Sequence, residues 1–204
     1  MKKLIRLLLF CILFIACASF PPLIPPTLDT DPCSTATIVL IQNDNPICRA
    51  VVLGPRVAIT AAHCVEGVSA IGYGTEWLPR YPTADVVVVD TDRDLAILSL
   101  SEPRQKWGHL QLNRELRVGD TVTVAGRRQA AVTDRSKWWT SIGSGTKRQL
   151  IEVDVSAPEG SSGSPLCDGS GAVVGICLGH SINGPTRGYF TSVNSVVSLL
   201  IEKS

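Results

Sequence analysis

The chain has 204 residues, of which 18% are charged and 45% hydrophobic, and its formal net charge is +1. This length allows one sizeable core or two small cores that share an interface, and the composition excludes a disordered chain. A net charge this close to zero provides no strong attraction toward nucleic acid, so we expect no nucleic-acid partner.

Residues 1–18 have the pattern of a secretory signal peptide, with three basic residues followed by an apolar run at 7–16. The apolar run is too short for a membrane span. Two processing sites are open: cleavage before Ser19, or a lipobox-like Phe-Ile-Ala-Cys that makes Cys17 the lipidated first residue. We favour lipidation, because nothing else in the sequence accounts for a cysteine directly after Ala16.

Residues 19–32 form a proline-rich tether, suited to holding a domain away from a surface. We therefore expect an extracytoplasmic protein, either secreted or anchored to the membrane by lipid. Such a compartment permits disulfides. Five cysteines remain after the signal region, an odd number that leaves at least one thiol unpaired within the chain: Cys33, Cys48, Cys64, Cys167 and Cys177. No cysteine or histidine cluster has zinc spacing, so we expect no metal and no cofactor.

After the tether, the chain consists of two sets of short β-rich runs separated by turn residues. The first set covers 37–41, 50–53, 57–60, 85–90 and 95–100, and the second covers 121–125, 149–155, 166–167, 172–178 and 188–193. Apolar residues at helical spacing predict one short helix over 193–202. The pattern indicates an all-β fold with a C-terminal helix, divided into 33–106 and 107–204. The segment 135–139, with two adjacent tryptophans, could contact a membrane or a substrate, but we interpret it as a solvated loop with partly packed indoles.

The first candidate site residue is His63, which follows a predicted strand in the sequence Ile-Thr-Ala-Ala-His-Cys. The small residues Ala61 and Ala62 allow a tight turn that packs the imidazole against the core. Cys64 offers a covalent anchor beside the histidine. Cys48 lies on the preceding strand, and a hairpin brings the two sulfurs together. We therefore predict a Cys48–Cys64 disulfide. Cys33 has two possible partners, Cys167 and Cys177, and the sequence does not choose between them.

The second candidate is Asp94, which stands immediately before the buried run Leu-Ala-Ile-Leu. Its carboxylate is placed to point into a polar crevice and orient an imidazole. Asp90 and Asp92 are interpreted as exposed. The third candidate is Ser162, in the sequence Pro-Glu-Gly-Ser-Ser-Gly-Ser-Pro-Leu over 158–166, where glycines let backbone N–H groups approach a substrate carbonyl.

In this order, these three residues resemble the trypsin/chymotrypsin-like serine peptidases, as does the segment Gly-Tyr-Phe-Thr-Ser-Val at 188–193. The resemblance extends over nearly all of the chain from residue 35 onward. It implies two packed six-stranded antiparallel β-barrels with the site between them. It also implies Ser162 as nucleophile, His63 as general base and then acid, and Asp94 as the group that orients the imidazole. The N–H groups of Gly160 and Ser162 would form the oxyanion hole.

The chain departs from the commonest family pattern at several positions. Ser161 replaces the aspartate that pairs with a new N-terminus after zymogen cleavage, so we expect no such activation. Ser164 replaces a glycine, as in glutamyl endopeptidases, but Cys177 stands where those enzymes carry a specificity histidine. The pocket base near Ser156 has no aspartate, which argues against Lys or Arg preference and favours small or apolar side chains. The expected pocket residues are Ser156, Cys177, Leu178, Gly179, His180 and Gly188.

The leading hypothesis is an extracytoplasmic serine endopeptidase that cleaves protein or peptide substrates through an acyl-enzyme. The alternative is a non-catalytic, protease-fold binding module anchored at the cell surface. Retention of all three candidate residues favours the enzyme. An α/β-hydrolase is rejected, because the chain order differs, helices are lacking, and Asn183 breaks the elbow-like motif that begins at Gly179.

Overall fold

The computed structural model describes residues 32–74, 81–112, 114–125, 128–140, 147–181 and 186–203. The predicted signal peptide, Cys17 and the tether up to residue 31 lie outside these ranges. No helix within them is long and apolar enough to cross a membrane.

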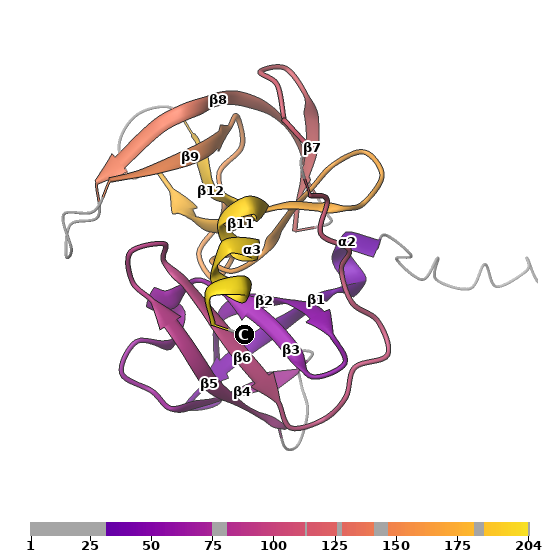
Figure 1. Ribbon diagram of the computed structural model, residues 1–204, viewed down its shortest axis with the longest axis vertical. Coiled ribbons are helices and arrows are strands. Elements are labelled where there is room, and N and C mark those ends of the chain that lie inside the picture. Colours follow the sequence, from indigo (N-terminus) through magenta and orange to yellow (C-terminus); the bar gives the residue numbers. More distant parts are fainter. Residues whose placement is uncertain are drawn as a thin grey trace, which may run out of the picture.

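The first half of the chain forms a closed antiparallel barrel with the strand order β1-β2-β3-β6-β5-β4 (Figure 1). A short helix α2 (Pro32–Thr35) precedes it, and a 3₁₀ helix η2 (Ala62–Val65) follows β3. The six strands are β1 (Thr37–Gln42), β2 (Asn45–Gly54), β3 (Val57–Thr60), β4 (Ala70–Gly74), β5 (Thr83–Asp90) and β6 (Leu95–Leu100).

The second half forms another closed antiparallel barrel, in the order β10-β11-β12-β9-β8-β7, followed by helix α3 (Val193–Glu202). Its strands are β7 (Thr121–Val124), β8 (Arg128–Thr140), β9 (Lys147–Val153), β10 (Pro165–Cys167), β11 (Val173–His180) and β12 (Gly188–Ser192). The predicted fold class, two six-stranded barrels with a short C-terminal helix, is confirmed.

Helix α3 lies between the two barrels (Figure 1). Its N-cap is Ser192, whose hydroxyl accepts the N–H of Asn194 and so satisfies one of the free donors of the first turn. Its buried residues, spaced at three, are Val193, Val196 and Leu199. The last two join a buried cluster that also contains Val51, Ile59 and Leu95 of the first barrel and Val173 and Ile176 of the second. The helix therefore packs against both barrels.

A disulfide between Cys33 and Cys167 joins the segment before the first barrel to β10 of the second. The sequence left Cys33 to pair with either Cys167 or Cys177, and the structure selects Cys167. Cys177 is the free cysteine among the described residues.

Two strands were missing from the sequence prediction. The segment 135–139 was interpreted as a loop but lies in β8, which pairs with both β7 and β9. Charged residues interrupt the β8 pattern, and Ala130 and Val132 are its buried apolar residues in the described part of the strand. The other missing strand, β4, contains two glycines that weaken its β signal.

Candidate active site

His63 is held at the junction between the core of the first barrel and solvent. Strand β3 ends inside the barrel, and the buried Ala61 and Ala62 then let the chain turn into η2. The predicted disulfide between Cys64 and Cys48 ties this turn to β2. The His63 side chain is 43% exposed, so a substrate in solution can reach the imidazole.

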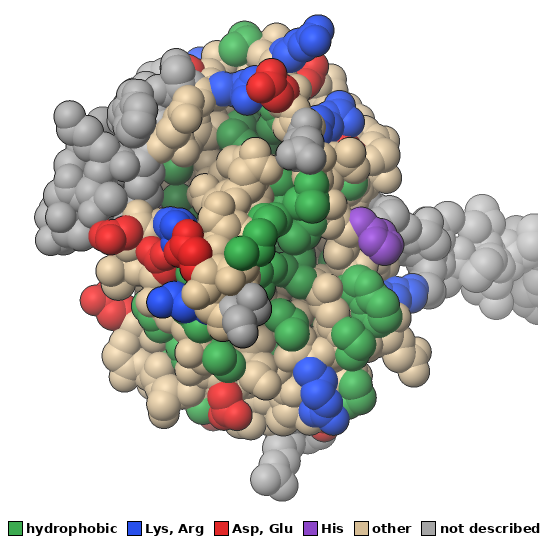
Figure 2. All heavy atoms as spheres, in the orientation of Figure 1, with side chains coloured by type: hydrophobic (Ala, Val, Ile, Leu, Met, Phe, Trp, Pro, Cys, Tyr) green, Lys and Arg blue, Asp and Glu red, His purple; other side chains and the backbone are tan. Residues whose placement is uncertain are grey.

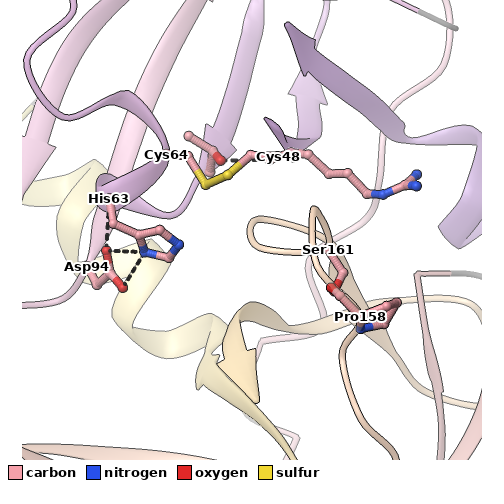
Figure 3. The surroundings of a disulfide bond; sticks show 8 residues. Cys48, His63, Cys64, Asp94, Pro158 and Ser161 are labelled. Carbon is pink, nitrogen blue, oxygen red and sulfur yellow. Dashed lines mark hydrogen bonds and ion pairs between the residues drawn. A yellow bond between two sulfur atoms is a disulfide. The ribbon is translucent and has the colours of Figure 1, made fainter. Parts of the chain in front are cut away.

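Asp94 holds His63 through both main chain and side chain (Figure 3). Its carbonyl oxygen accepts the N–H of Ala62 at 3.0 Å. Its Oδ1 accepts the backbone N–H of His63 at 3.0 Å. The Nδ1 atom of His63 lies 3.1 Å from Oδ1 and 3.0 Å from Oδ2. Because an ionised carboxylate only accepts hydrogen bonds, the proton of the neutral imidazole belongs on Nδ1, and Nε2 keeps a lone pair.

The loop that carries Ser162 begins with a tight turn over Pro158 to Ser161. The N–H of Ser161 donates to the carbonyl of Pro158 at 3.0 Å, and Gly160, in the third position, has φ +76°. A positive φ at this position defines a type II turn, which glycine adopts without a side-chain penalty. The N–H groups of Gly160 and Ser162 donate to no partner within the described part of the chain. This loop therefore has two backbone donors, two residues apart, that the described part of the chain leaves unused.

The Ser162 loop is fastened to both barrels. The N–H of Arg49 on β2 donates to the carbonyl of Ser162 at 2.8 Å, and the N–H of Gly163 donates to the carbonyl of Cys177 on β11, also at 2.8 Å. A Cβ atom on Gly163 would lie 1.9 Å from the carbonyl oxygen of Arg49 and 2.4 Å from Oγ1 of Thr60. Only glycine permits this approach of the loop to the first barrel.

These contacts bring the three candidate residues to one place at the junction of the barrels. His63 adjoins Cys64, which is bonded to Cys48, and Cys48 adjoins Arg49, whose N–H holds Ser162. In Figure 3 the second ring nitrogen of His63 points toward the loop that carries Pro158 and Ser161. Among the described residues the imidazole bonds to Asp94 and not to Ser162. A nucleophile–base contact often tightens only when substrate binds.

Cys48, His63 and Cys64 place potential metal-ligand atoms within 4.8 Å of one another. The two sulfur atoms are bonded to each other, so neither is a thiolate that could bind zinc. This cluster is explained by the disulfide.

A family model described as a trypsin-like peptidase domain matches residues 48–176, more than half of the chain. The chain belongs to the trypsin-like peptidases. The matched region contains all three candidate residues.

Several curated relatives are similar over part of the chain. A "Probable periplasmic serine endoprotease DegP-like" of Brucella suis biovar 1 is 30% identical over 103 residues, which are 46% of this chain and 20% of the relative. The "Serine protease Do-like HtrA" of Bacillus subtilis is 31% identical over 140 residues, 60% of this chain and 30% of the relative. The matched regions therefore cover less than a third of either relative's length.

A solved structure, the Rv3671c protease from M. tuberculosis in its active form, has the same fold. It superimposes with a TM-score of 0.68 at 20% identity, covering 90% of this chain and 91% of that one. At this identity the likeness establishes the two-barrel fold alone.

The residues expected to line the substrate pocket of this trypsin-like peptidase differ in exposure. Leu178, Gly179 and His180, at the end of β11, are partly exposed, as is Ser156. Cys177 and Gly188 are buried. A Cβ atom on Gly188 would lie 2.8 Å from the carbonyl of Val155, so the packing of β12 already requires a glycine there.

Cys177 lies behind the nucleophile loop. Burial raises the pKa of its thiol to about 12, against smaller opposing effects of the Gly179 backbone and the neighbouring Ser161 side chain. The hydroxyl of Ser161, itself buried, donates to the carbonyl of Pro158. The residue that replaces the family's aspartate is therefore bonded within its own loop.

Two features of the site were missed in the sequence. Asp90 was expected to be exposed, but it is half-buried and accepts hydrogen bonds from the backbone and the side chain of Arg93. Their spacing of three residues across a turn could have suggested this pairing. The hydrogen bond from the N–H of Arg49 to the carbonyl of Ser162 leaves no signal in the sequence, because any residue except proline can donate a backbone hydrogen bond.

Proposed function

We propose that this chain is a serine endopeptidase with Ser162 as nucleophile, His63 as general base and then general acid, and Asp94 as the group that orients His63. The observation that carries the proposal is the hydrogen-bonded His63–Asp94 pair near a loop whose Gly160 and Ser162 N–H groups bond to no described residue. Membership of the trypsin-like peptidases supports the same chemistry.

In the proposed reaction, the hydroxyl oxygen of Ser162 attacks the carbonyl carbon of a peptide bond while Nε2 of His63 takes the hydroxyl proton. His63 then gives that proton to the leaving amine, which departs as the C–N bond breaks. Water attacks the resulting ester in the same way and releases the acid. The carboxylate of Asp94 stabilises the imidazolium that forms in each half.

The N–H groups of Gly160 and Ser162 would bind the oxygen that becomes negatively charged. Donors fixed before the reaction stabilise this charge without reorganisation, and removing one such donor typically costs about 10²–10³ in rate. The type II turn at Gly160 supports this role, because it fixes the direction of the Gly160 peptide group.

We propose that this geometry forms without zymogen cleavage. In the commoner family pattern, an aspartate before the nucleophile pairs with a newly made N-terminus. Here the hydroxyl of Ser161 bonds to Pro158, so the turn requires no new N-terminus to hold it. We therefore expect full activity from the chain as secreted.

Substrate preference stays a prediction. With Ser156 at the expected pocket base, no carboxylate is present there to bind Lys or Arg, and small or apolar side chains are favoured. Cys177, Leu178, Gly179, His180 and Gly188 remain the proposed wall residues.

We propose an extracytoplasmic location, with Cys17 as the lipid anchor, and the division into barrels at 33–106 and 107–204. Two disulfides among the described residues support an oxidising compartment, and the Brucella relative is named as a probable periplasmic protein. The intact mass of the mature protein tests the anchor. A diacylglyceryl adduct on Cys17 is expected, whereas a chain that begins at Ser19 would contradict it.

The function is tested with a fluorophosphonate probe, which reacts with activated serines. Wild type should be labelled at Ser162, and Ser162→Ala should lose all labelling while keeping its melting temperature. Ser101→Ala, at an exposed serine outside the site, is the matched control and should label normally. When wild type is incubated with peptide substrates, the products should show cleavage at internal peptide bonds. A folded wild type that resists the probe and cleaves nothing would leave the binding module as the better explanation.

A further inference from the structure

The turn that carries Asp94 is attached to helix α3 on both sides of that residue. Leu95, which follows Asp94, is fully buried in the cluster that contains Val196 and Leu199 of α3. Arg93, which precedes Asp94, reaches Glu202 in the last turn of the same helix. Asp94 therefore lies between two residues that are fixed to one rigid element.

The Arg93 bridge consists of several short, charge-assisted hydrogen bonds. Its guanidinium donates to the two carboxylate oxygens of Glu202 at 2.6 and 2.9 Å. It also donates to Oδ2 of Asp90 at 2.7 Å. The backbone N–H of Arg93 donates to Oδ1 of Asp90 at 2.7 Å. A two-point pair of this kind fixes the orientation of the groups as well as their distance.

At Arg93 the turn is held by ion pairs and not by buried apolar contacts, and the space beside Arg93 is open. A cavity of about 740 Å³ is lined by Asp90, Arg93 and Glu202, among other residues. Figure 2 shows acidic and basic side chains close together on this face of the molecule. Removing a charge here would therefore break the connection without creating a void in the core.

Asp94 needs such a hold because its backbone conformation is unfavourable. Its φ of +53° lies in the left-handed region, which is uncommon for residues with a side chain, although aspartate tolerates it better than most. The same residue contacts Ala62 with its carbonyl and His63 with its carboxylate. Relaxation of the turn would therefore move the carboxylate away from the imidazole.

We propose that Arg93 and Glu202 are positioning residues, whose ion pair ties the Asp94 turn to α3 and so fixes the carboxylate against His63. This inference rests on the proposed function, since its consequence for rate requires that His63 be the general base. Its geometric part, the orientation of the imidazole, holds independently of turnover.

The test compares Glu202→Gln and Arg93→Gln with wild type on a fluorogenic peptide substrate. Each variant should lower kcat about tenfold with KM within about twofold, below the ~10²-fold that a 1 Å misplacement can cost. The double variant should lose no more than either single one, because both act through one pair. Arg93→Lys, which keeps the charge without the two-point geometry, should recover part of kcat.

Arg114→Gln is the matched control. It breaks another ion pair, between Arg114 and Asp168 at 2.6 Å. Arg114 lines the same cavity as Arg93, but its partner Asp168 is not part of the Asp94 turn. Its kcat should equal that of wild type. If Arg114→Gln lowers kcat as much as Glu202→Gln does, the effect is general and the proposed role of the bridge is overturned.

Proton NMR separates this inference from the proposed function. The His63 Nδ1–H proton bonded to Asp94, assigned by its loss in His63→Ala, should shift or broaden in Glu202→Gln and not in Arg114→Gln. If wild type fails to turn over yet this signal changes, the peptidase proposal fails and the bridge stands. If wild type is active and Glu202→Gln keeps both its kcat and its signal, the bridge is overturned and the peptidase stands.

Discussion

The N–H of Arg49 donates a hydrogen bond of 2.8 Å to the carbonyl oxygen of Ser162, from β2 of the first barrel to the nucleophile loop of the second. Arg49 follows Cys48, and the Cys48–Cys64 disulfide joins this position to the residue beside His63. The candidate base and nucleophile are thus set relative to each other by backbone and disulfide contacts. Substitutions that disturb this contact should affect rate and stability together.

Gly163→Ala should both displace the Ser162 loop from Arg49 and destabilise the protein. The added Cβ would lie 1.9 Å from the carbonyl oxygen of Arg49, in a residue whose φ is +81°. Left-handed conformation costs about 1–2 kcal/mol and overpacking about 1–3 kcal/mol, so we expect a loss of about 3 kcal/mol or more. Urea unfolding measures the loss, and fluorophosphonate labelling should fall at least tenfold.

Gly119→Ala separates backbone strain from the clash. Gly119 has φ +93°, but no atom lies within 4 Å of its added Cβ. This variant should lose only about 1–2 kcal/mol and should label normally. Equal losses in the two variants would show that the close approach of the Ser162 loop to Arg49 is unimportant.

His63, Asp94 and Ser162 were chosen as candidates because their order and the motifs around them resemble the trypsin/chymotrypsin-like serine peptidases. The structure pairs His63 with Asp94, and the role of Ser162 stays a prediction. The contacts that hold these three residues in place could not be predicted from the sequence. The bond from Arg49 uses only backbone atoms, and the Arg93–Glu202 pair joins residues 109 positions apart.

The fold class could be predicted because short apolar runs recurred with turn residues between them and no long helical pattern. The strand β8 could not, because Asp134 and Arg135 interrupt its alternation while its backbone pairs with two neighbours. Its hydrogen bonds come from β7 and β9, which a local pattern does not reveal. The partner of Cys33 was also open, since it depends on where α2 lies against β10.

Replacing both Cys33 and Cys167 by alanine should lower the free energy of unfolding by about 4–5 kcal/mol. This disulfide joins residues separated by 134 positions, so it restricts a large loop in the unfolded chain. Urea unfolding of the double variant, compared with oxidised wild type, measures the change. Wild type in reductant should show a larger loss, because the Cys48–Cys64 disulfide is reduced as well.

The thiol of Cys177 should be unreactive in the folded protein. Burial raises its pKa to about 12, so only about one molecule in 10⁴ carries a thiolate at about pH 8. Iodoacetamide followed by peptide mass mapping should find Cys177 unmodified in native protein and alkylated in urea. Rapid alkylation of the native state would mean that the nucleophile loop opens readily and exposes β11.

Asp168 should make folding stability depend on acid pH. Burial raises the pKa of this carboxyl, but hydrogen bonds from the hydroxyl and N–H of Ser170, from the N–H of Ala172, and the charge of Arg114 outweigh burial. The net result is a pKa below the usual 3.8. A carboxyl whose folded pKa is depressed stabilises the protein above the unfolded value, and this contribution is lost as pH falls through the folded value.

Asp168→Asn should therefore cost about 2–4 kcal/mol near neutral pH, since it leaves the buried donors around it without a charged acceptor. The difference from wild type should stay constant down to about pH 5. It should then shrink as the pH falls through 3.8 and below, where wild type protonates the same group. Urea unfolding at several pH values measures both curves. Arg114→Gln, which removes one of the opposing causes, should give a smaller cost with the same pH dependence, and parallel curves down to about pH 3 would contradict the assignment to Asp168.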